Sequence, residues 1–558
     1  MIILLPILFL MLACLVMLTL RLVRPTFSLH WLIAVPAAFI AWLLVVFSRL
    51  RIPLELPLVV WQPIELFPIS PALLLDSTSW PIALALITLT LSTLLTDVAR
   101  AGHLLGENLS EDQQTYSQMS QPPGWTAWAS SLSLASIGLL ALLAENILTL
   151  LLTLSALDLV QLLIELRFAD QSGERERIII AYTARLAGLV GVIWAGMLAF
   201  STGLSMKLND LTPQVSVFLM ASAGLRLGAL LVNPQPPMEL VRRQRGLGSL
   251  ISLAPAAVNV LLLARSAQAG APAEAYPYLL ALAGFVALYS SFSWLIEENE
   301  AEGQFYWVAG FGSLVLVSAV NQSPQASLAW GLALLLPGGL LFLYSGRRRW
   351  LLIFQAVGWL GISSLPFTPA WQGVWMYISP FKPFMVIFLI AHALLISGAV
   401  RHALRTNPIL TATAGERWVW IIYPLGLVLL PLVHLAVAMG TLFQTADSNG
   451  LKQPGYLESW PAAVSLALSG LMIFLAKTRF AGRRTSTALP IHTALRSFFS
   501  LEWLYRLLWN LYRWSRKIFF LLATLLEGPA GILWALVLLT LLLTMLTQFT
   551  AATSTAGG

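Results

Sequence analysis

Charged residues are scarce in this sequence. Asp, Glu, Lys and Arg make up only 10% of the 558 residues, whereas 58% are hydrophobic. The mean hydropathy of +0.81 lies far outside the range of soluble domains. The composition therefore indicates an integral membrane protein and argues against an attached soluble catalytic domain.

Cysteine is nearly absent, because Cys14 is the only one in the chain. A single cysteine excludes a disulfide framework and a cysteine set for an iron–sulfur cluster. The sequence also has no Gly-rich dinucleotide loop. We therefore predict no cofactor in this chain, and any redox chemistry would belong to partner subunits.

The first apolar segment, residues 2–20, has no Lys or Arg before it, and Arg21 and Arg24 follow it. A signal peptide has a cationic start, so we interpret this segment as a retained helix with its N-terminus outside. Cleavage before Cys14, as in a lipoprotein, is the weaker alternative because the same cationic start is missing.

Long apolar stretches recur along the whole chain. A helix needs roughly 20 apolar residues to cross the hydrocarbon core, and these lengths suit helices rather than a barrel. We predict an all-α polytopic membrane protein with about 14 to 16 transmembrane helices. The expected segments lie near residues 2–20, 28–48, 80–99, 126–143, 147–165, 179–200, 214–232, 249–265, 277–296, 305–320, 326–344, 350–365, 383–400, 418–440, 461–477 and 530–548.

Basic residues gather in the loops that follow odd-numbered segments, which places those loops in the cytoplasm. We therefore predict a multi-pass protein of the cell (inner) membrane with both termini outside. The net charge of +7 is explained by these loops and predicts no nucleic-acid partner. The basic residues that most strongly indicate cytoplasmic loops are Arg175, Arg177, Arg242, Arg243, Arg245, Arg347, Arg348, Arg349, Arg401 and Arg405.

Two further segments carry charge. Glu297, Glu298, Glu300 and Glu302 form an acidic run that is either a solvated loop or a cation site, and the first interpretation is favoured. Residues 489–526 alternate basic with large apolar side chains, which predicts an amphipathic lateral helix before the last span. That helix could brace neighbouring subunits or anchor the chain at the membrane interface.

Five short motifs follow one another along the chain. They are LLLDSTS at 73–79, AENIL with LDL at 144–159, GLRLG at 224–228, GWLGISSLP at 358–366 and LEGPAGILWA at 526–535. Their order resembles the antiporter-like subunits of complex I, membrane-bound hydrogenases and Mrp antiporters, from about residue 73 onward. The resemblance implies two inverted five-helix repeats and, for the amphipathic segment, a shortened lateral helix. Prolines also break helices, so we predict that Pro255, Pro337 and Pro366 interrupt the eighth, eleventh and twelfth spans.

The family carries protons on an acidic residue in its fifth helix and on lysines in later helices, and burial makes lysine suitable for that task. By resemblance, the acidic position falls on Ser155, with Asp158 one turn later as a displaced substitute. The seventh-helix lysine falls on Arg226, which keeps the charge but cannot release a proton. The eighth-helix lysine falls on Val258, while Arg265 matches the basic residue at that helix end.

The remaining family positions fall near Leu334, Gly338 and Val374, so the outward half of the relay looks empty. Several polar groups within or near the spans are possible replacements, because ionisable residues in membranes are functional by default. They are Glu145, Asn146, Glu165, Arg185, Asn259, His392 and His434. Glu145 and Glu165 could mark helix ends only, and a lone histidine is more often a packing residue.

The resemblance implies four regions: helices one to three at 1–125, an antiporter-like core at 126–400, extra helices at 401–480, and the surface helix with the final span at 481–558. It implies other membrane subunits of a complex I-like or antiporter-like assembly as partners, with lipid and with protons or monovalent cations. We expect either a transport subunit with a degenerate relay, in which Asp158 and Arg226 are coupled, or a structural subunit that moves no ion. A membrane enzyme acting on lipid-linked substrates has no nucleophile–base pattern to support it.

Overall fold

The structure is a computed structural model of the chain. It describes residues 2–25, 27, 29–59, 69–101, 124–169, 171–231, 245–344, 349–377, 382–405, 419–447, 454–479, 502–527, 533 and 536–544. The basic loop residues Arg242, Arg243, Arg347 and Arg348, the start of the amphipathic segment and most of the last motif lie outside these residues. The chain divides into two compact units, Met1–Ala488 and Leu489–Gly558.

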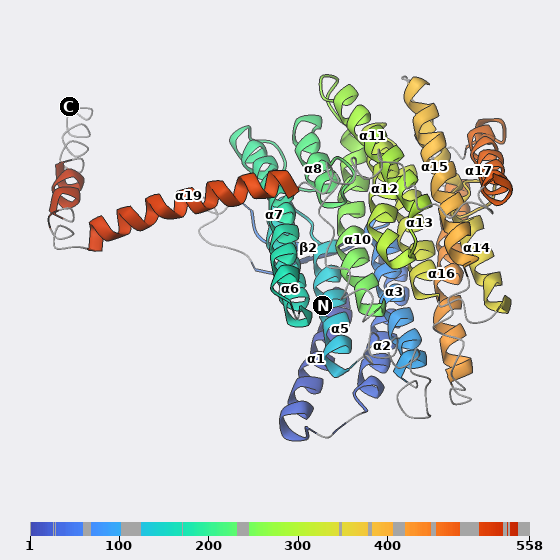
Figure 1. The fold of residues 1–558 in the computed structure, drawn as a ribbon, viewed down its shortest axis with the longest axis horizontal. Coiled ribbons are helices and arrows are strands. Elements are labelled where there is room, and N and C mark those ends of the chain that lie inside the picture. Colours follow the sequence, from blue (N-terminus) through green and yellow to red (C-terminus); the bar gives the residue numbers. More distant parts are fainter. Residues whose placement is uncertain are drawn as a thin grey trace. The chain divides into compact units, whose positions relative to one another are not determined.

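The first unit is a bundle of long helices (Figure 1). Among the described residues, 12 helices are long and apolar enough to cross a membrane, and two apolar helices are shorter. The predicted total of 14 to 16 spans remains a prediction. The helices are α1 (Leu5–Val23), α2 (Trp31–Ser48), α3 (Ser79–Ala101), α5 (Trp125–Leu142), α6 (Ile147–Phe168), α7 (Ser172–Ser201), α8 (Pro213–Arg226), α10 (Arg245–Ala269), α11 (Tyr276–Ile296), α12 (Glu300–Val320), α13 (Pro324–Leu343), α14 (Leu352–Ile362), α15 (Lys382–Ala403), α16 (Val419–Asp447) and α17 (Trp460–Arg479).

Burial separates the helices into central and peripheral ones. The apolar stretches of α3, α12 and α13 are almost wholly buried. In α1, α2 and α7, only about a third of the apolar stretch is buried. Buried threonine hydroxyls in α3 donate to carbonyls one turn earlier, as Thr88 does to Leu84, so they need no partner on another helix. Small residues let the central helices approach closely, which is how membrane helices pack.

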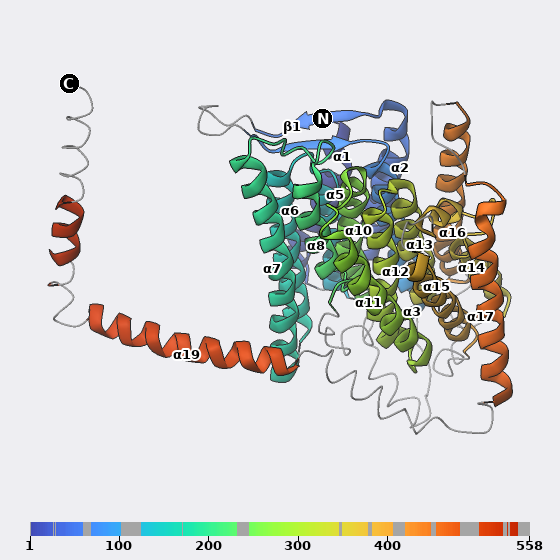
Figure 2. The ribbon, with the colours of Figure 1, turned by 90° about the horizontal axis from the view of Figure 1, so that it is seen from above.

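Within the described part of the chain, one antiparallel ribbon interrupts the all-α architecture. Strand β1 (Leu54–Pro57) pairs with β2 (Ala72–Leu75), with Leu54 opposite Leu75. Two isolated bridges continue the pairing from Leu73 to Ala144 and from Asn146 to Lys207. The resulting strip of extended chain lies across one end of the helices (Figure 2).

Two of the predicted spans, 214–232 and 350–365, form shorter helices in the structure. Helix α8 has 14 residues and ends at Arg226, six residues before the predicted end, because Gly228 turns the chain with φ = +71°. Helix α14 has 11 residues and ends at Ile362, before the predicted break at Pro366. Positive φ at Ser364 and Phe367 marks the irregular chain that follows.

Two other predicted breaks are wrong. Pro255 and Pro337 lie inside the continuous helices α10 and α13. A proline removes one helical hydrogen bond, but a helix enclosed by neighbours can keep its course through that loss. The expected interruptions of the eighth and eleventh spans therefore do not occur.

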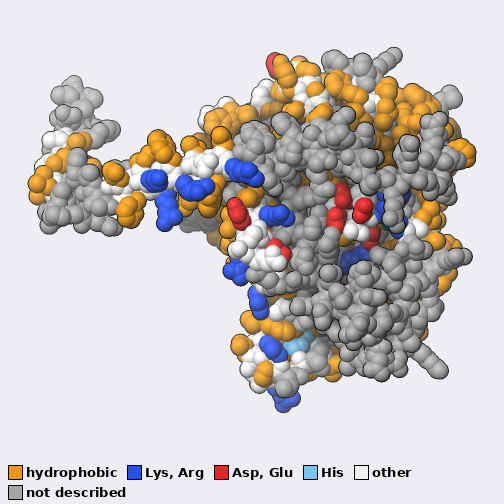
Figure 3. All heavy atoms as spheres, in the orientation of Figure 1, with side chains coloured by type: hydrophobic (Ala, Val, Ile, Leu, Met, Phe, Trp, Pro, Cys, Tyr) orange, Lys and Arg blue, Asp and Glu red, His pale blue; other side chains and the backbone are white. Residues whose placement is uncertain are grey.

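In the second unit, α19 (Glu502–Glu527) is a helix of 26 residues. Arg506, Arg513, Arg516 and Lys517 share one side of it at helical spacing. In Figure 3, Lys and Arg side chains lie along this helix among exposed hydrophobic ones. The predicted helix is present over the described residues, and its course along the membrane remains a prediction.

Candidate functional site: a buried carboxylate–arginine array

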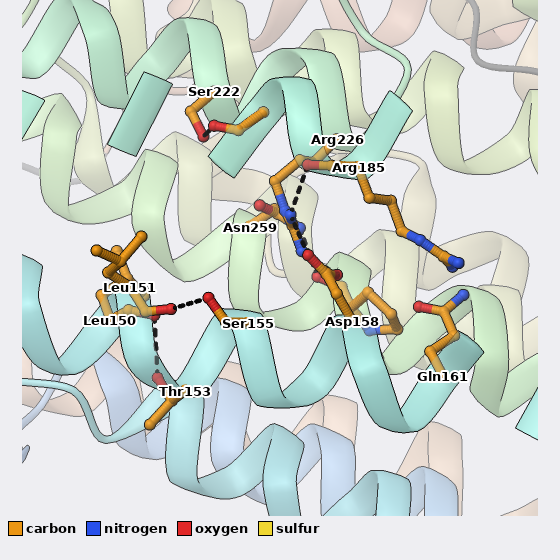
Figure 4. A network of polar contacts seen from close by, with 12 residues as sticks. Leu150, Leu151, Thr153, Ser155, Asp158, Gln161, Arg185, Ser222, Arg226 and Asn259 are labelled. Carbon is orange, nitrogen blue, oxygen red and sulfur yellow. Dashed lines mark hydrogen bonds and ion pairs between the residues drawn. The ribbon is translucent and has the colours of Figure 1, made fainter. Parts of the chain in front are cut away.

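Asp158 on α6 and Arg226 on α8 form a two-pronged ion pair. Arg226 Nη2 lies 2.6 Å from Asp158 Oδ1, and Arg226 Nη1 lies 2.8 Å from Asp158 Oδ2. Both side chains are only 1% exposed. This geometry is the strongest form of a charged hydrogen bond, and it shields both charges from the apolar surroundings (Figure 4).

The end of α8 favours a cation at this place. Arg226 is the last residue of the helix, and the amide of Leu227 donates to Ala223 O to close the final turn. The carbonyl end of a helix carries a partial negative charge, which stabilises a nearby cation. A short helix that ends inside the bundle therefore positions the guanidinium beside α6.

Gly188 on α7 makes room for the arginine stem. A Cβ at this position would lie 2.4 Å from Arg226 Cγ and 2.9 Å from Cδ. In addition, Ser222 Oγ donates to Gly188 O at 2.5 Å, which fixes α8 against α7. Only glycine lets the side chain of Arg226 pass at this crossing.

A second carboxylate–arginine pair continues the first. Arg185 on α7 donates from Nη1 and Nη2 to Glu165 on α6, at 3.2 and 3.0 Å. Gln161 Nε2 donates to Glu165 Oε1 at 2.8 Å. Asp158, Gln161 and Glu165 are spaced at i, i+3 and i+7, so they share one face of α6.

Arg185 also links the two pairs, because its main-chain carbonyl accepts a hydrogen bond of 3.0 Å from Arg226 Nη1. We call these five residues, Asp158, Gln161, Glu165, Arg185 and Arg226, the charge array. It contains two carboxylates and two guanidinium groups. Because arginine stays protonated in proteins, only the carboxylates could exchange protons within the array.

Glu145 lies apart from the array, two residues before the first residue of α6. Its carboxylate pairs with Lys207 at 2.9 Å, and Lys207 is 58% exposed. This contact raises the pKa of Lys207, mainly through the hydrogen bond to Glu145. The next residue, Asn146, caps α6 by accepting from the amide of Thr149. Glu145 thus lies beside the start of α6, and a transport role for it remains a prediction.

Arg265 at the far end of α10 is also buried. It donates to Ala144 O at 2.6 Å and lies 3.7 Å from Asp76 Oδ2. Asp76 Oδ1 in turn accepts from the amides of Thr78 and Ser79 at the start of α3. Arg265 therefore ties the beginnings of α3 and α6 to α10.

His392 on α15 has partners on both ring nitrogens. Nε2 lies 2.8 Å from Ile362 O, the terminal carbonyl of α14, and Nδ1 lies 3.2 Å from the hydroxyl of Tyr377. A carbonyl only accepts, so Nε2 carries the proton. His434 Nε2 on α16 has no hydrogen-bond partner among the described residues. Among the described residues, neither histidine forms a hydrogen bond or ion pair with the charge array.

The remaining family positions are apolar in the structure. Val258, Leu334, Gly338 and Val374 are all buried. A Cβ at Gly338 would lie 2.4 Å from Trp307 Nε1, so a large indole occupies the space beside it. The four positions to which the sequence resemblance assigned ionisable groups are thus buried apolar positions.

The acidic run does not gather into a metal site in the described part of the chain. Glu300 pairs with Arg245, and Glu302 accepts from Asn299 Nδ2 at 3.0 Å. Within the described residues, no group of three or more His, Cys, Asp or Glu could hold a metal ion.

Sequence reasoning missed Gly188 and Gln161 and treated Glu165 and Arg185 only as isolated polar residues. For Gln161, the i, i+3, i+7 spacing with Asp158 and Glu165 was a usable signal. Gly188 offered none, because a glycine in an apolar helix shows its role only when the neighbouring helix is known.

No protein-family model matches the sequence, and no curated protein sequence matches it. Solved structures do match. A chain of the Mrp complex from Dietzia sp. DQ12-45-1b superposes with a TM-score of 0.64 at 13% identity, covering 97% of this chain and 63% of that one. This chain therefore spans less than two thirds of the length of that Mrp chain.

A chain of the membrane-bound sulfane sulfur reductase, an archaeal respiratory membrane complex, superposes with a TM-score of 0.61 at 13% identity. The match covers 98% of this chain and 99% of that chain. At such low identity, these likenesses show the fold alone. This chain therefore shares its fold with chains of an Mrp complex and of a respiratory membrane complex, which agrees with the resemblance that the sequence motifs predicted.

Proposed function

We propose that this chain is an antiporter-like subunit of a proton- or cation-translocating membrane complex of the respiratory or Mrp type. Its own relay is degenerate and reduced to the charge array. The observation that carries the proposal is the buried pair of Asp158 and Arg226 at the end of the short helix α8. Charges enclosed among membrane helices are costly, and they mark functional positions by default.

Within the array, Asp158 would be the proton-exchanging group and Arg226 the fixed charge that controls it. Neutralising Asp158 by a proton would leave Arg226 with a buried, unbalanced charge, which is costly. Proton uptake would therefore require a compensating change elsewhere in the complex, and that requirement is the basis of coupling.

A non-translocating structural subunit is the second candidate. It is favoured by the packed apolar positions Val258, Leu334, Gly338 and Val374, which offer no ionisable group beyond the array. In that case the array would only hold α6, α7 and α8 together. The antiporter-like core at 126–400 would then serve as a scaffold for neighbouring subunits.

The deciding experiment measures ion movement in the intact complex. The tagged chain is purified from its own membranes in mild detergent, its partners are identified by mass spectrometry, and the complex is reconstituted into vesicles. We expect Asp158→Asn to reduce proton or cation flux strongly. A matched control, Glu300→Gln, removes the carboxylate of another ion pair and should leave the flux near its original value.

If Asp158→Asn leaves the flux unchanged in a complex with normal subunit composition, the translocating role is wrong and the structural role is supported. If no membrane subunits copurify, membership of such a complex is wrong.

We further propose that the protein lies in the inner membrane with both termini outside. The basic residues Arg175 and Arg177 near the start of α7 support a cytoplasmic connection between α6 and α7. Reporter fusions to each terminus test the orientation, and a cytoplasmic signal from either one would overturn it.

A further inference from the structure

The charge array contains buried polar atoms that the protein does not satisfy. Gln161 Oε1 and Arg185 Nε are buried and have no hydrogen-bond partner among the described residues. Buried polar atoms in folded proteins are nearly always paired with protein or with ordered water. Two such atoms in one cluster, one an acceptor and one a donor, indicate a ligand that can both donate and accept.

The two atoms belong to side chains that meet at one point. Gln161 Nε2 and Arg185 Nη1 both donate to Glu165 Oε1, at 2.8 and 3.2 Å. The amide of Gln161 cannot be turned around, because its oxygen would then face the carboxylate of Glu165. The orientation that leaves Gln161 Oε1 open is therefore fixed by Glu165.

The other array atoms leave little choice of ligand. A metal cation would face two guanidinium groups, and an anion would face two carboxylates. A neutral molecule with both donor and acceptor capacity suits the cluster, and water is the smallest one. Gln161 and Glu165 also lie within the last two turns of α6, which ends at Phe168.

We propose that Gln161, Glu165 and Arg185 form a water-binding site that connects the Asp158–Arg226 pair to the aqueous phase at the α6–α7 connection. Gln161 Oε1 and Arg185 Nε are the atoms that would contact this water, and Glu165 orients both side chains. The inference deepens the proposed function, because it names the route by which water would reach the proton-exchanging residue.

The single cysteine of the chain makes a direct test possible. In a Cys14→Ser background, Gln161→Cys places one thiol at the site, and Leu157→Cys places one on a fully buried apolar position one turn earlier on α6. A charged, membrane-impermeant methanethiosulfonate is added to each side of oriented vesicles. Because the reagent needs a hydrated thiolate, we expect the thiol at position 161 to react about tenfold or more faster than that at 157.

The reaction should occur from the side at which α6 joins α7. Equal and slow labelling at both positions in folded protein would overturn the proposal, as would labelling from the opposite side only.

A second measurement covers the case in which Gln161→Cys does not fold. In the unsubstituted protein, solid-state NMR detects magnetisation transfer from water to the Gln161 side-chain amide, assigned by its loss in Gln161→Met. Absence of transfer in the unsubstituted protein would also overturn the site. Neither readout depends on ion flux, so a hydrated site in a complex that moves no ion would refute the proposed function alone.

Discussion

Arg226 donates a hydrogen bond of 3.0 Å to the main-chain carbonyl of Arg185, so one arginine is anchored by the backbone of another. The two guanidinium groups carry like charges, yet each is held by its own carboxylate, Asp158 or Glu165. A movement of Arg226 would disturb the residue that holds Glu165. The two ion pairs are therefore expected to respond together rather than separately.

The first prediction concerns the unequal cost of breaking the Asp158–Arg226 pair. Removing one partner of a buried ion pair costs about 3–5 kcal/mol. Asp158 can take up a proton when Arg226 is replaced, but Arg226 cannot lose one when Asp158 is replaced. We therefore expect Asp158→Asn to lower the thermal unfolding temperature more than Arg226→Gln, measured by intrinsic fluorescence in detergent.

The double variant Asp158→Asn/Arg226→Gln supplies the control for that experiment. It leaves no unbalanced charge, so it should be more stable than Asp158→Asn alone. Strict additivity of the two single effects would show that the pair contributes no interaction energy.

The second prediction concerns Gly188. In Gly188→Ala, the added Cβ would meet Arg226 Cγ at 2.4 Å and force the arginine stem to move. Overpacking of this kind costs about 1–3 kcal/mol. Gly173→Ala on the same helix is the matched control, because a Cβ there meets nothing within 4 Å. We expect a clear loss of stability in the first variant only, and equal stability would show that Arg226 can easily take another path.

The third prediction concerns His392. His392→Leu removes the donor to Ile362 O and leaves that buried carbonyl and the hydroxyl of Tyr377 without it. An unsatisfied buried polar group costs about 1–3 kcal/mol. Met439→Leu, at an exposed position of α16, should have no comparable effect. If flux changed while stability did not, His392 would have a transport role instead of a structural one.

The fourth prediction concerns pH. Glu145 raises the pKa of Lys207 above its ordinary value of 10.5, so the folded protein holds this proton more tightly than the unfolded chain. The stabilisation from this pair is present below pH 10.5 and is lost as the pH rises through the raised value. In Lys207→Gln, the fall in unfolding temperature between pH 9 and pH 12 should be shallower than in the unchanged protein.

Because Lys207 is 58% exposed, its effect should be small and should shrink further in high salt. An identical pH profile with and without Lys207 would show that the contact is not populated in solution.

Much of the fold follows from the sequence for simple physical reasons. Long apolar runs predict spans, and 12 of the described helices are long and apolar enough to cross a membrane. The turn at Gly228 lies within a motif singled out from the sequence alone. The ribbon of β1 and β2 was missed because strands of only four residues are too short for their side-chain pattern to be told apart from other segments. The breaks at Pro255 and Pro337 were wrong because tertiary packing outweighs one lost hydrogen bond.

The candidate site was only partly accessible to sequence reasoning. Asp158 and Arg226 stood out because charge in an apolar segment is visible without a structure. Their contact, and the link through the carbonyl of Arg185, depend on three helices coming together. His392 shows the opposite case, since a titratable residue in a span proved to be bonded to the end of α14.

The strip formed by β1, β2, the chain around Ala144 and the chain around Lys207 is joined through main-chain amides and carbonyls. Such hydrogen bonds use no side-chain atoms, so most substitutions leave them in place. These hydrogen bonds hold the first turns of α3 and α6 in register, whichever residues occupy the surrounding positions. A frame of this kind can persist through extensive substitution, which accords with a shared fold at 13% identity.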